Sequence, residues 1–206
     1  MAEFDLGAMG PREAYHLLTR LVAPRPIALV SSQRADGVGN LAPFSFFMVG
    51  GANPPSCVIC PVNDRHGAPK DTLRNIEATG EYVINVSTRA LAERINQASY
   101  PYQYGVDEFD RVGLTRAPSR VVAPPRVAES PAQLECVHHE IVRHGDGPLG
   151  SNYVIGEVVA IHVADEVLRG GLPDDRAIEF IGRLGQAFYT HVTSDSLFEM
   201  ERPEEP

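Results

Sequence analysis

The chain has 206 residues, of which 43% are hydrophobic and 22% charged, proportions typical of a globular protein with a sizeable core. Its formal net charge is −9 at pH 7, and a surface of this sign repels nucleic-acid backbones and anionic membranes. We therefore expect no nucleic-acid partner and no membrane partner, although an anionic cofactor can bind where basic groups gather. No signal-type apolar region and no run of about twenty apolar residues occurs, so the expected compartment is the cytoplasm.

In chain order, the first half predicts an arm, a helix and three extended segments. Residues 1–10 form the arm, and Pro11 suits the first turn of an amphipathic helix at 11–21 that Pro24 and Pro26 end. The extended segments are a strand at 27–32, an aromatic stretch at 41–49 that follows a turn at 35–37, and a strand at 57–62. Together they resemble a β-meander.

The second half begins with a predicted helix at 70–78, which Gly80 ends, a strand at 81–86 and a helix at 88–98. Residues 99–132 form a long irregular segment punctuated by proline, and such segments tend to be functional or to lie at interfaces. Two long strands follow at 133–142 and 152–163, and then a short helix at 194–201 and a Pro- and Glu-rich end that we expect to be disordered.

Six or seven strands with two or three short helices do not alternate in a βαβ rhythm. Closure into a barrel removes sheet edges, so the expected fold class is mainly β, a β-barrel with a few short helices. The absence of a G-x-G-x-x-G motif disfavours a doubly wound dinucleotide fold. We expect a single barrel domain at 21–190, preceded by the arm and helix at 1–20 and followed by a tail at 191–206.

The three cysteines are an odd count and do not imply a disulfide framework. Cys57 and Cys60 match C-x-x-C but lie in an apolar run, where residues three apart on a strand point to opposite faces. We therefore expect both to be buried small hydrophobes rather than redox or metal ligands. Cys136 and His138 would share a strand face, but no third ligand follows at a helpful spacing, so no metal site is expected.

Two segments carry possible binding chemistry. Residues 40–47 (NLAPFSFF) combine small residues with aromatics, so their amides can approach the polar edge of a flat ligand such as a flavin. On residue types alone, an aromatic strand packed into the core is the simpler interpretation. Residues 65–75 place Arg65 and Lys70 before a helix start, which suits a phosphate. Ordinary capping by Asp71 or Thr72 explains the same residues equally well.

Five segments, taken in order, resemble the flavin reductase-like family: RPIALVSS at 25–32, NLAPFSFF at 40–47, PKDTLRNI at 69–76, GEYVIN at 80–85 and GEVV at 156–159. The resemblance extends from about residue 20 to about residue 190. No single segment is diagnostic, but the ordered set is specific.

The resemblance implies an FMN-binding split β-barrel that holds FMN non-covalently at a homodimer interface. For the flavin, it implies roles for the residues that match the family's first strand and the segment after its first turn: Ser31, Ser32, Asn40, Ala42, Pro43, Phe44 and Ser45. The match to the family's phosphate site implies roles for Arg65, Lys70, Asp71 and Thr72. The segment GRLG at 182–185 adds Arg183, and Tyr189 follows close behind it.

The chemistry that the resemblance implies is hydride transfer from NADH or NADPH to FMN, and onward electron transfer to an acceptor such as a partner monooxygenase or an electron-transfer protein. The chain shows no convincing nucleophile–base pair, which agrees with a reaction that the cofactor carries. His162 is a weak catalytic candidate, and an ordinary strand histidine is the simpler interpretation. The alternatives are an FMN oxidase of small amines or pyridoxal-type substrates, a flavoredoxin-like electron carrier or flavin-binding module without direct NAD(P)H activity, and a flavin-free binding module.

Overall fold

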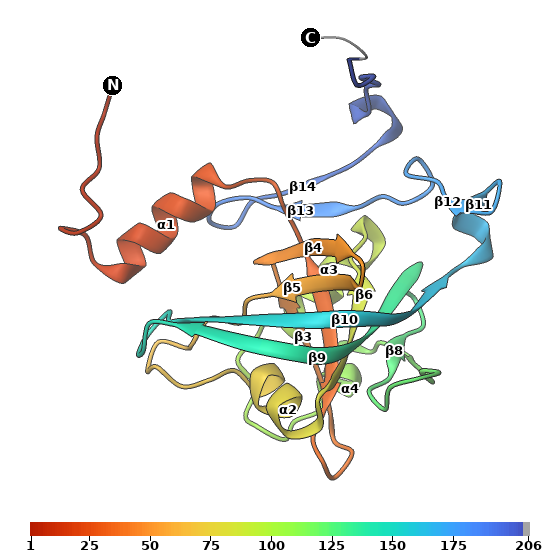
Figure 1. The fold of residues 1–206 in the computed structure, drawn as a ribbon, viewed down its shortest axis with the longest axis horizontal. Helices are drawn as coiled ribbons and strands as arrows, with labels where there is room; N and C mark the ends of the chain where they lie inside the picture. The colour runs from red at the N-terminus through yellow and green to blue at the C-terminus, as the bar shows by residue number, and fades with distance from the viewer. Residues whose placement is uncertain (204–206) are drawn as a thin grey trace.

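The structure is a computed structural model that describes residues 1–203. Its centre is a seven-stranded antiparallel sheet in the order β3-β2-β6-β9-β10-β5-β4 (Figure 1). The strands are β2 (Ala28–Gln33), β3 (Gly39–Phe44), β4 (Phe47–Ala52), β5 (Pro55–Ile59), β6 (Glu81–Val86), β9 (Ala132–His144) and β10 (Ser151–Val163). The two edge strands, β3 and β4, are separated in the chain only by Ser45 and Phe46. The sheet must therefore curl until its edges meet, which makes it a barrel.

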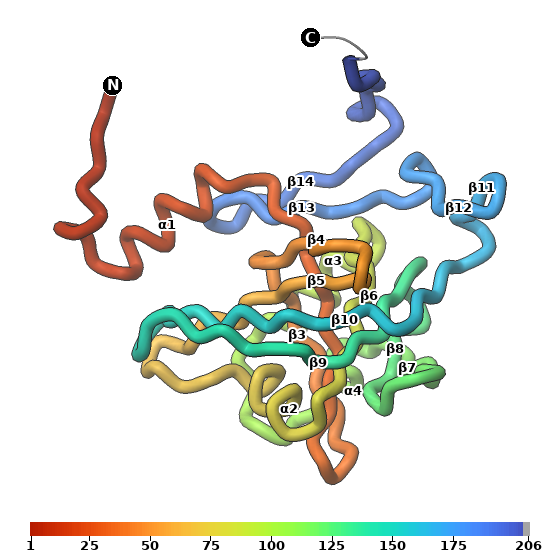
Figure 2. Tube along the Cα trace, in the orientation of Figure 1, coloured from red at the N-terminus to blue at the C-terminus, as the bar shows by residue number. Residues whose placement is uncertain are grey.

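Two long strands form the spine of this barrel. β9 and β10 pair along almost their whole length, and Figure 2 shows them running side by side across the molecule. Their register shifts between Ile155 and Gly156, where the bulge helps to bend the ribbon. A Cβ at Gly156 would lie 2.0 Å from the Tyr82 hydroxyl, so only glycine leaves room for that buried ring.

Within residues 1–203, four α-helices surround the barrel: α1 (Pro11–Leu21), α2 (Asp71–Thr79), α3 (Ala92–Ala98) and α4 (Glu108–Val112). Alternation along β2 divides the core in two, because successive side chains of a strand point to opposite faces. Leu29 belongs to a cluster with residues of α3 and α4, such as Ile95 and Phe109. Val30 belongs to a cluster with Tyr82 of β6 and residues of α2 and β5.

Small peripheral sheets complete the fold. β1 (Arg25–Pro26) pairs with β13 (Ile181–Arg183), which pairs with β14 (Tyr189–His191), and this sheet lies to the same side of the barrel as α1 and both termini (Figure 1). The other short pairs are β7 (Arg116–Ala117) with β8 (Arg126–Val127), and β11 (Leu168–Arg169) with β12 (Leu172–Pro173). The described residues also form three 3₁₀ helices: η1 (Arg89–Leu91), η2 (Asp165–Val167) and η3 (Ser194–Ser196).

Most of the helices and strands predicted from the sequence are present in the structure, and a few need correction. The helix at 11–21 and the strand at 81–86 have the predicted bounds. The stretch at 41–49 is broken into β3 and β4, and the segment 99–132 contains α4, β7 and β8. The predicted tail helix at 194–201 is wrong, because only the three residues of η3 are helical there. At the predicted disordered end, residues 204–206 lie outside the described part of the chain. Within residues 1–203, no helix is both long and apolar enough to cross a membrane.

Candidate functional site

A cavity of about 720 Å³, hereafter the main cavity, opens between α1 and one end of the barrel. Its walls come from α1, the β3–β4 connection, residues 60–70 and the β9–β10 turn. Ligand pockets typically measure about 300–1,000 Å³, so a cofactor-sized molecule fits here. Of the predicted site residues, the main cavity gathers Pro43, Phe44, Ser45, Arg65 and Lys70.

Arg25 holds α1 against this cavity. It is buried, and its guanidinium donates to the carbonyl oxygens of Thr19 and Val22, both at 2.6 Å, near the end of α1. It also reaches the Leu184 carbonyl at 3.0 Å and Ser45 Oγ at 3.4 Å. Burial lowers the pKa of Arg25, but its four acceptors satisfy the cation. One side chain thereby joins α1, the β3–β4 connection and the β13–β14 turn.

One wall of the main cavity is aromatic. The rings of Tyr15 and Phe46 lie 5.8 Å apart between centroids, and Phe44 lines the same space. Edge and tilted contacts of this kind hold aromatic rings firmly in place. The wall is therefore a preformed apolar surface suited to a flat ring.

The main cavity is also lined by three positively charged side chains, Arg12, Arg65 and Lys70. Lys70 is the only lysine in the whole chain. The nearby carboxylate of Asp64 is occupied by the N–H groups of Ala68 and His66, at 2.9 and 2.7 Å, and these bonds hold the pKa of Asp64 below its usual range. An acidic protein thus presents a local excess of positive charge in this one cavity.

The start of α2 adds hydrogen-bond donors. Its N-cap is Lys70, whose extended backbone (φ −68°, ψ 154°) precedes a helix with no side-chain cap. Capping by Asp71 or Thr72 is therefore not observed. Among residues 1–203, no acceptor takes the backbone N–H groups of residues 71–73. Such free donors, with the partial positive charge of a helix N-terminus, favour an anion.

A buried polar cluster fixes the position of this helix start. The Asn40 side-chain amide donates to Thr72 Oγ1 at 2.9 Å and to Ser32 Oγ at 3.3 Å, and Asn75 donates to Ser32 Oγ at 3.1 Å. All four side chains are buried. Within the described residues, neither hydroxyl donates to an acceptor and Asn75 Oδ1 has no partner. The cluster retains hydrogen-bonding capacity, although it does not line the main cavity.

The other predicted site residues lie outside the main cavity. Ser31 Oγ donates to the Pro125 carbonyl at 2.5 Å, and Ala42 pairs with Val30 inside the sheet. Asp71 lies at the start of α2 beside Arg74, with 3.4 Å between Oδ1 and Nη1, and burial raises its pKa. The Arg183 guanidinium lies 4.3 Å from the centre of the Tyr189 ring on the β13–β14 hairpin.

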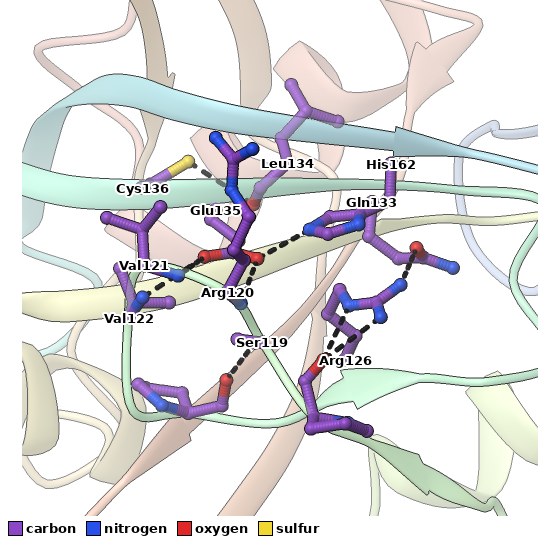
Figure 3. A network of polar contacts seen from close by, with 12 residues as sticks. Ser119, Arg120, Val121, Val122, Arg126, Gln133, Leu134, Glu135, Cys136 and His162 are labelled. Carbon is purple, nitrogen blue, oxygen red and sulfur yellow. Dashed lines mark hydrogen bonds and ion pairs between the residues drawn. The ribbon is translucent and has the colours of Figure 1, made fainter.

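His162 belongs to a separate network (Figure 3). Its Nε2 lies 2.5 Å from Oε1 of Glu135, a fully buried carboxylate. Glu135 also accepts the backbone N–H groups of Arg120, Val121 and Val122 at 2.7, 2.6 and 3.1 Å. Burial alone would raise the pKa of Glu135, but these four bonds lower it to about 2. His162 therefore makes a structural contact with the carboxylate of Glu135, and Glu135 anchors residues 120–122.

Several cavity residues were not predicted from the sequence. Pro11, Arg12, Tyr15 and His16 come from α1, and the others are Phe46, Cys60, Val62, Asn63, Asp64 and the turn residues Pro148 and Leu149. The spacing of Arg12, Tyr15 and His16 is the one usable signal, because residues three and four apart share a helix face. Nothing local in the sequence shows that this face covers the barrel end.

A family model described as "Flavin reductase like domain" matches residues 20–178. A protein of Halalkalibacterium halodurans is 36% identical over 198 residues, which cover 95% of this chain and 94% of the relative. The structure of nitrilotriacetate monooxygenase component B from Bacillus cereus is similar with a TM-score of 0.90 at 31% identity, covering 97% of this chain and 98% of that one. A split-barrel protein from Shewanella frigidimarina, assigned as a flavin reductase, has a TM-score of 0.81 at 26% identity, covering 98% and 100%. These likenesses confirm the predicted split-barrel fold.

Proposed function

Because the chain belongs to the flavin reductase-like family, we propose that it is an FMN-binding oxidoreductase that takes electrons from NADH or NADPH and passes them to an acceptor. The observation that carries the proposal is the main cavity, where aromatic side chains and three cations line one space beside the uncapped start of α2. A flavin ring needs a flat apolar surface, and its phosphate needs positive charge and N–H donors. The main cavity supplies both.

The residues present fit FMN at both ends. Lys70, Arg65 and the first N–H groups of α2 would hold the phosphate, and Phe44, Ser45 and Pro43 would border the ring. Behind them, Ser32, Asn40 and Thr72 would fix the helix start, with Asp71 and Ala42 next to it. Because these buried side chains do not line the main cavity, their part in the proposal would be to hold the helix start in place.

When bound, FMN supplies a ring that accepts a hydride from a nicotinamide and releases electrons singly or in pairs. The chain's own residues would bind and orient the FMN ring and exclude water from it. Tyr15 and Phe46 would shield one side of the ring, and Arg12 would add to the attraction of the phosphate. No side-chain acid or base is required for hydride transfer, so none is proposed.

The functional unit of this proposal is a cytoplasmic homodimer. Large apolar side chains are exposed on β4, where Met48 and Val49 are 59% and 75% exposed, and near the C-terminus, where Phe188 and Phe198 are 65% and 81% exposed. Exposed apolar surface of this kind favours association. In such a dimer, Arg183 and Tyr189 would contribute to the site of the other copy. A protein that elutes as a monomer at micromolar concentration would contradict this part.

The acceptor in this proposal is a partner monooxygenase or another electron-transfer protein. The support is the likeness to the component B structure of a monooxygenase from Bacillus cereus. Separated partner proteins of this kind exchange electrons in transient complexes, which need no permanent interface.

The experiment begins with the full-length protein, reconstituted with FMN and freed of excess flavin. A yellow protein that is bleached rapidly by NADH or NADPH under anaerobic conditions supports the reductase. Slow bleaching by both nicotinamides with rapid bleaching by a separate reductase supports a flavoredoxin-like carrier instead. A protein that stays colourless after reconstitution contradicts FMN binding altogether.

A further inference from the structure

A second cavity, of about 290 Å³, lies between the barrel and the sheet of β1, β13 and β14. Figure 1 shows β13 and β14 passing over the β4 side of the barrel, and residues from both sides line the cavity. Its walls are mostly apolar, with Phe47, Ile84 and Leu134 on the barrel side and Ile181 and Val192 on the other. It has no residue of the main cavity in its lining.

One polar side chain lines this apolar space without a partner. Ser87 is 3% exposed, and its Oγ has no hydrogen-bond partner within residues 1–203. Its backbone is satisfied differently, because the Ser87 carbonyl accepts the N–H of Ile181 at 3.2 Å. A buried hydroxyl without a partner costs free energy, and native structures contain few of them.

A neighbouring serine shows that the fold can satisfy such a group. Ser130 is also buried, and its hydroxyl lies 2.9 Å from the Val86 carbonyl and 2.8 Å from the Ala132 carbonyl. Ser87 follows Val86 directly in the chain, yet its own hydroxyl bonds to no carbonyl. The unused hydroxyl therefore points to a ligand rather than to backbone capping.

We infer that the second cavity binds a small aromatic or alicyclic molecule with one polar substituent, which hydrogen-bonds to Ser87 Oγ. An apolar cavity of about 150 Å³ is large enough for benzene, so the larger space here holds a substituted ring. The apolar lining supplies most of the affinity, and Ser87 selects for the polar group. This inference does not depend on FMN binding.

The two cavities share a wall. Phe46 lines the main cavity and Phe47, the next residue, lines the second one. Arg25 also lines the second cavity while its Nε donates to Ser45 Oγ in the main cavity. The sites are therefore distinct but adjacent, so the test must separate them.

The test uses the full-length protein saturated with FMN and fluorine NMR of 4-fluorophenol and fluorobenzene. We expect 4-fluorophenol to bind about 2- to 10-fold more tightly than fluorobenzene, the range for one neutral hydrogen bond. In Ser87→Ala this difference vanishes while fluorobenzene binding is retained. Val192→Phe fills the cavity and abolishes binding of both probes. The matched control is Val142→Phe, at an exposed position on β9 outside both cavities, which leaves binding unchanged.

Three results would overturn the inference. They are binding of both probes to the FMN-free protein alone, an undiminished phenol preference in Ser87→Ala, and no binding of either probe with or without FMN, which includes the case of a second copy filling the space. If Val192→Phe does not fold, crystals of the unaltered protein soaked in 4-bromophenol replace it. A bromine peak between β14 and the barrel supports the site, and a peak elsewhere refutes it.

Discussion

Lys70 offers the sharpest test of the main cavity, because its replacement removes the only side-chain ammonium group of the chain. A hydrogen bond between charged groups contributes about 1.5–3 kcal/mol. Lys70 is exposed, so screening by solvent reduces the expected loss in Lys70→Ala to about 1–2 kcal/mol. The dissociation constant for FMN should therefore rise by about 5- to 30-fold.

Fluorescence titration of FMN with each variant measures this effect. Lys70→Arg keeps the charge and should recover most of the affinity. Arg111→Ala, at an exposed position on α4 outside the main cavity, is the matched control and should bind as the unaltered protein does. High salt should shrink the difference between Lys70→Ala and the unaltered protein, because exposed charges are screened. Unchanged affinity in Lys70→Ala would remove this residue from the site.

The single lysine also permits a test without mutation. An amine-acylating reagent can modify only Lys70 and the N-terminal amine, and mass spectrometry of peptides distinguishes the two. Saturating FMN should slow acylation of Lys70 and leave the N-terminus unaffected. Equal rates at Lys70 with and without FMN would contradict contact with the phosphate.

Three further predictions concern stability and the helix start. The pKa of Glu135 falls from its usual 4.5 to about 2, so the ionised carboxylate stabilises the fold by about 3 kcal/mol above pH 4.5 and by progressively less as the pH falls toward 2. In urea unfolding at pH 7, Glu135→Gln should therefore be less stable than the unaltered protein by about this amount. An equal loss of stability at pH 2 would contradict the prediction. Gly156→Ala forces a Cβ against the Tyr82 hydroxyl and should lower the free energy of unfolding by about 1–3 kcal/mol, measured by thermal unfolding. Adding Tyr82→Phe removes the hydroxyl and should restore part of this loss. Full stability of Gly156→Ala alone would refute the contact. Thr72→Val removes the acceptor of the Asn40 amide and should weaken FMN binding about 3- to 10-fold by titration, whereas an unchanged affinity would separate this cluster from the site.

The sequence predicted those helices and strands whose ends and faces depend on residues close together in the chain. Gly80 ends α2 in the left-handed conformation (φ 76°), as a glycine after a helix should. The apolar strands without a βαβ rhythm required closure, and the sheet does curl on itself. The phosphate-binding hypothesis at Lys70 also depends on a local feature, the start of a helix.

Features that depend on distant contacts were not predictable from the sequence. The placement of α1 over the main cavity depends on Arg25, whose acceptors lie as far along the chain as Leu184. The burial of Cys57 and Cys60 was predicted correctly, but Cys57 Sγ also lies 3.8 Å from Cys136 Sγ, on the far side of the intervening strand β10. Cys57 and Cys136 lie on strands that are not neighbours in the sheet, so no spacing rule joins them.

The anchoring of residues 120–122 by Glu135 has a consequence for how this protein can diverge. The carboxylate contacts only main-chain N–H groups there, and the side chains of Arg120 and Val121 face solvent. Every amino acid except proline offers the same N–H group, so substitutions at these two positions leave the path of the backbone intact. Natural variants can therefore alter the outward chemistry of this segment, and with it any surface that a partner meets, without refolding the barrel beneath.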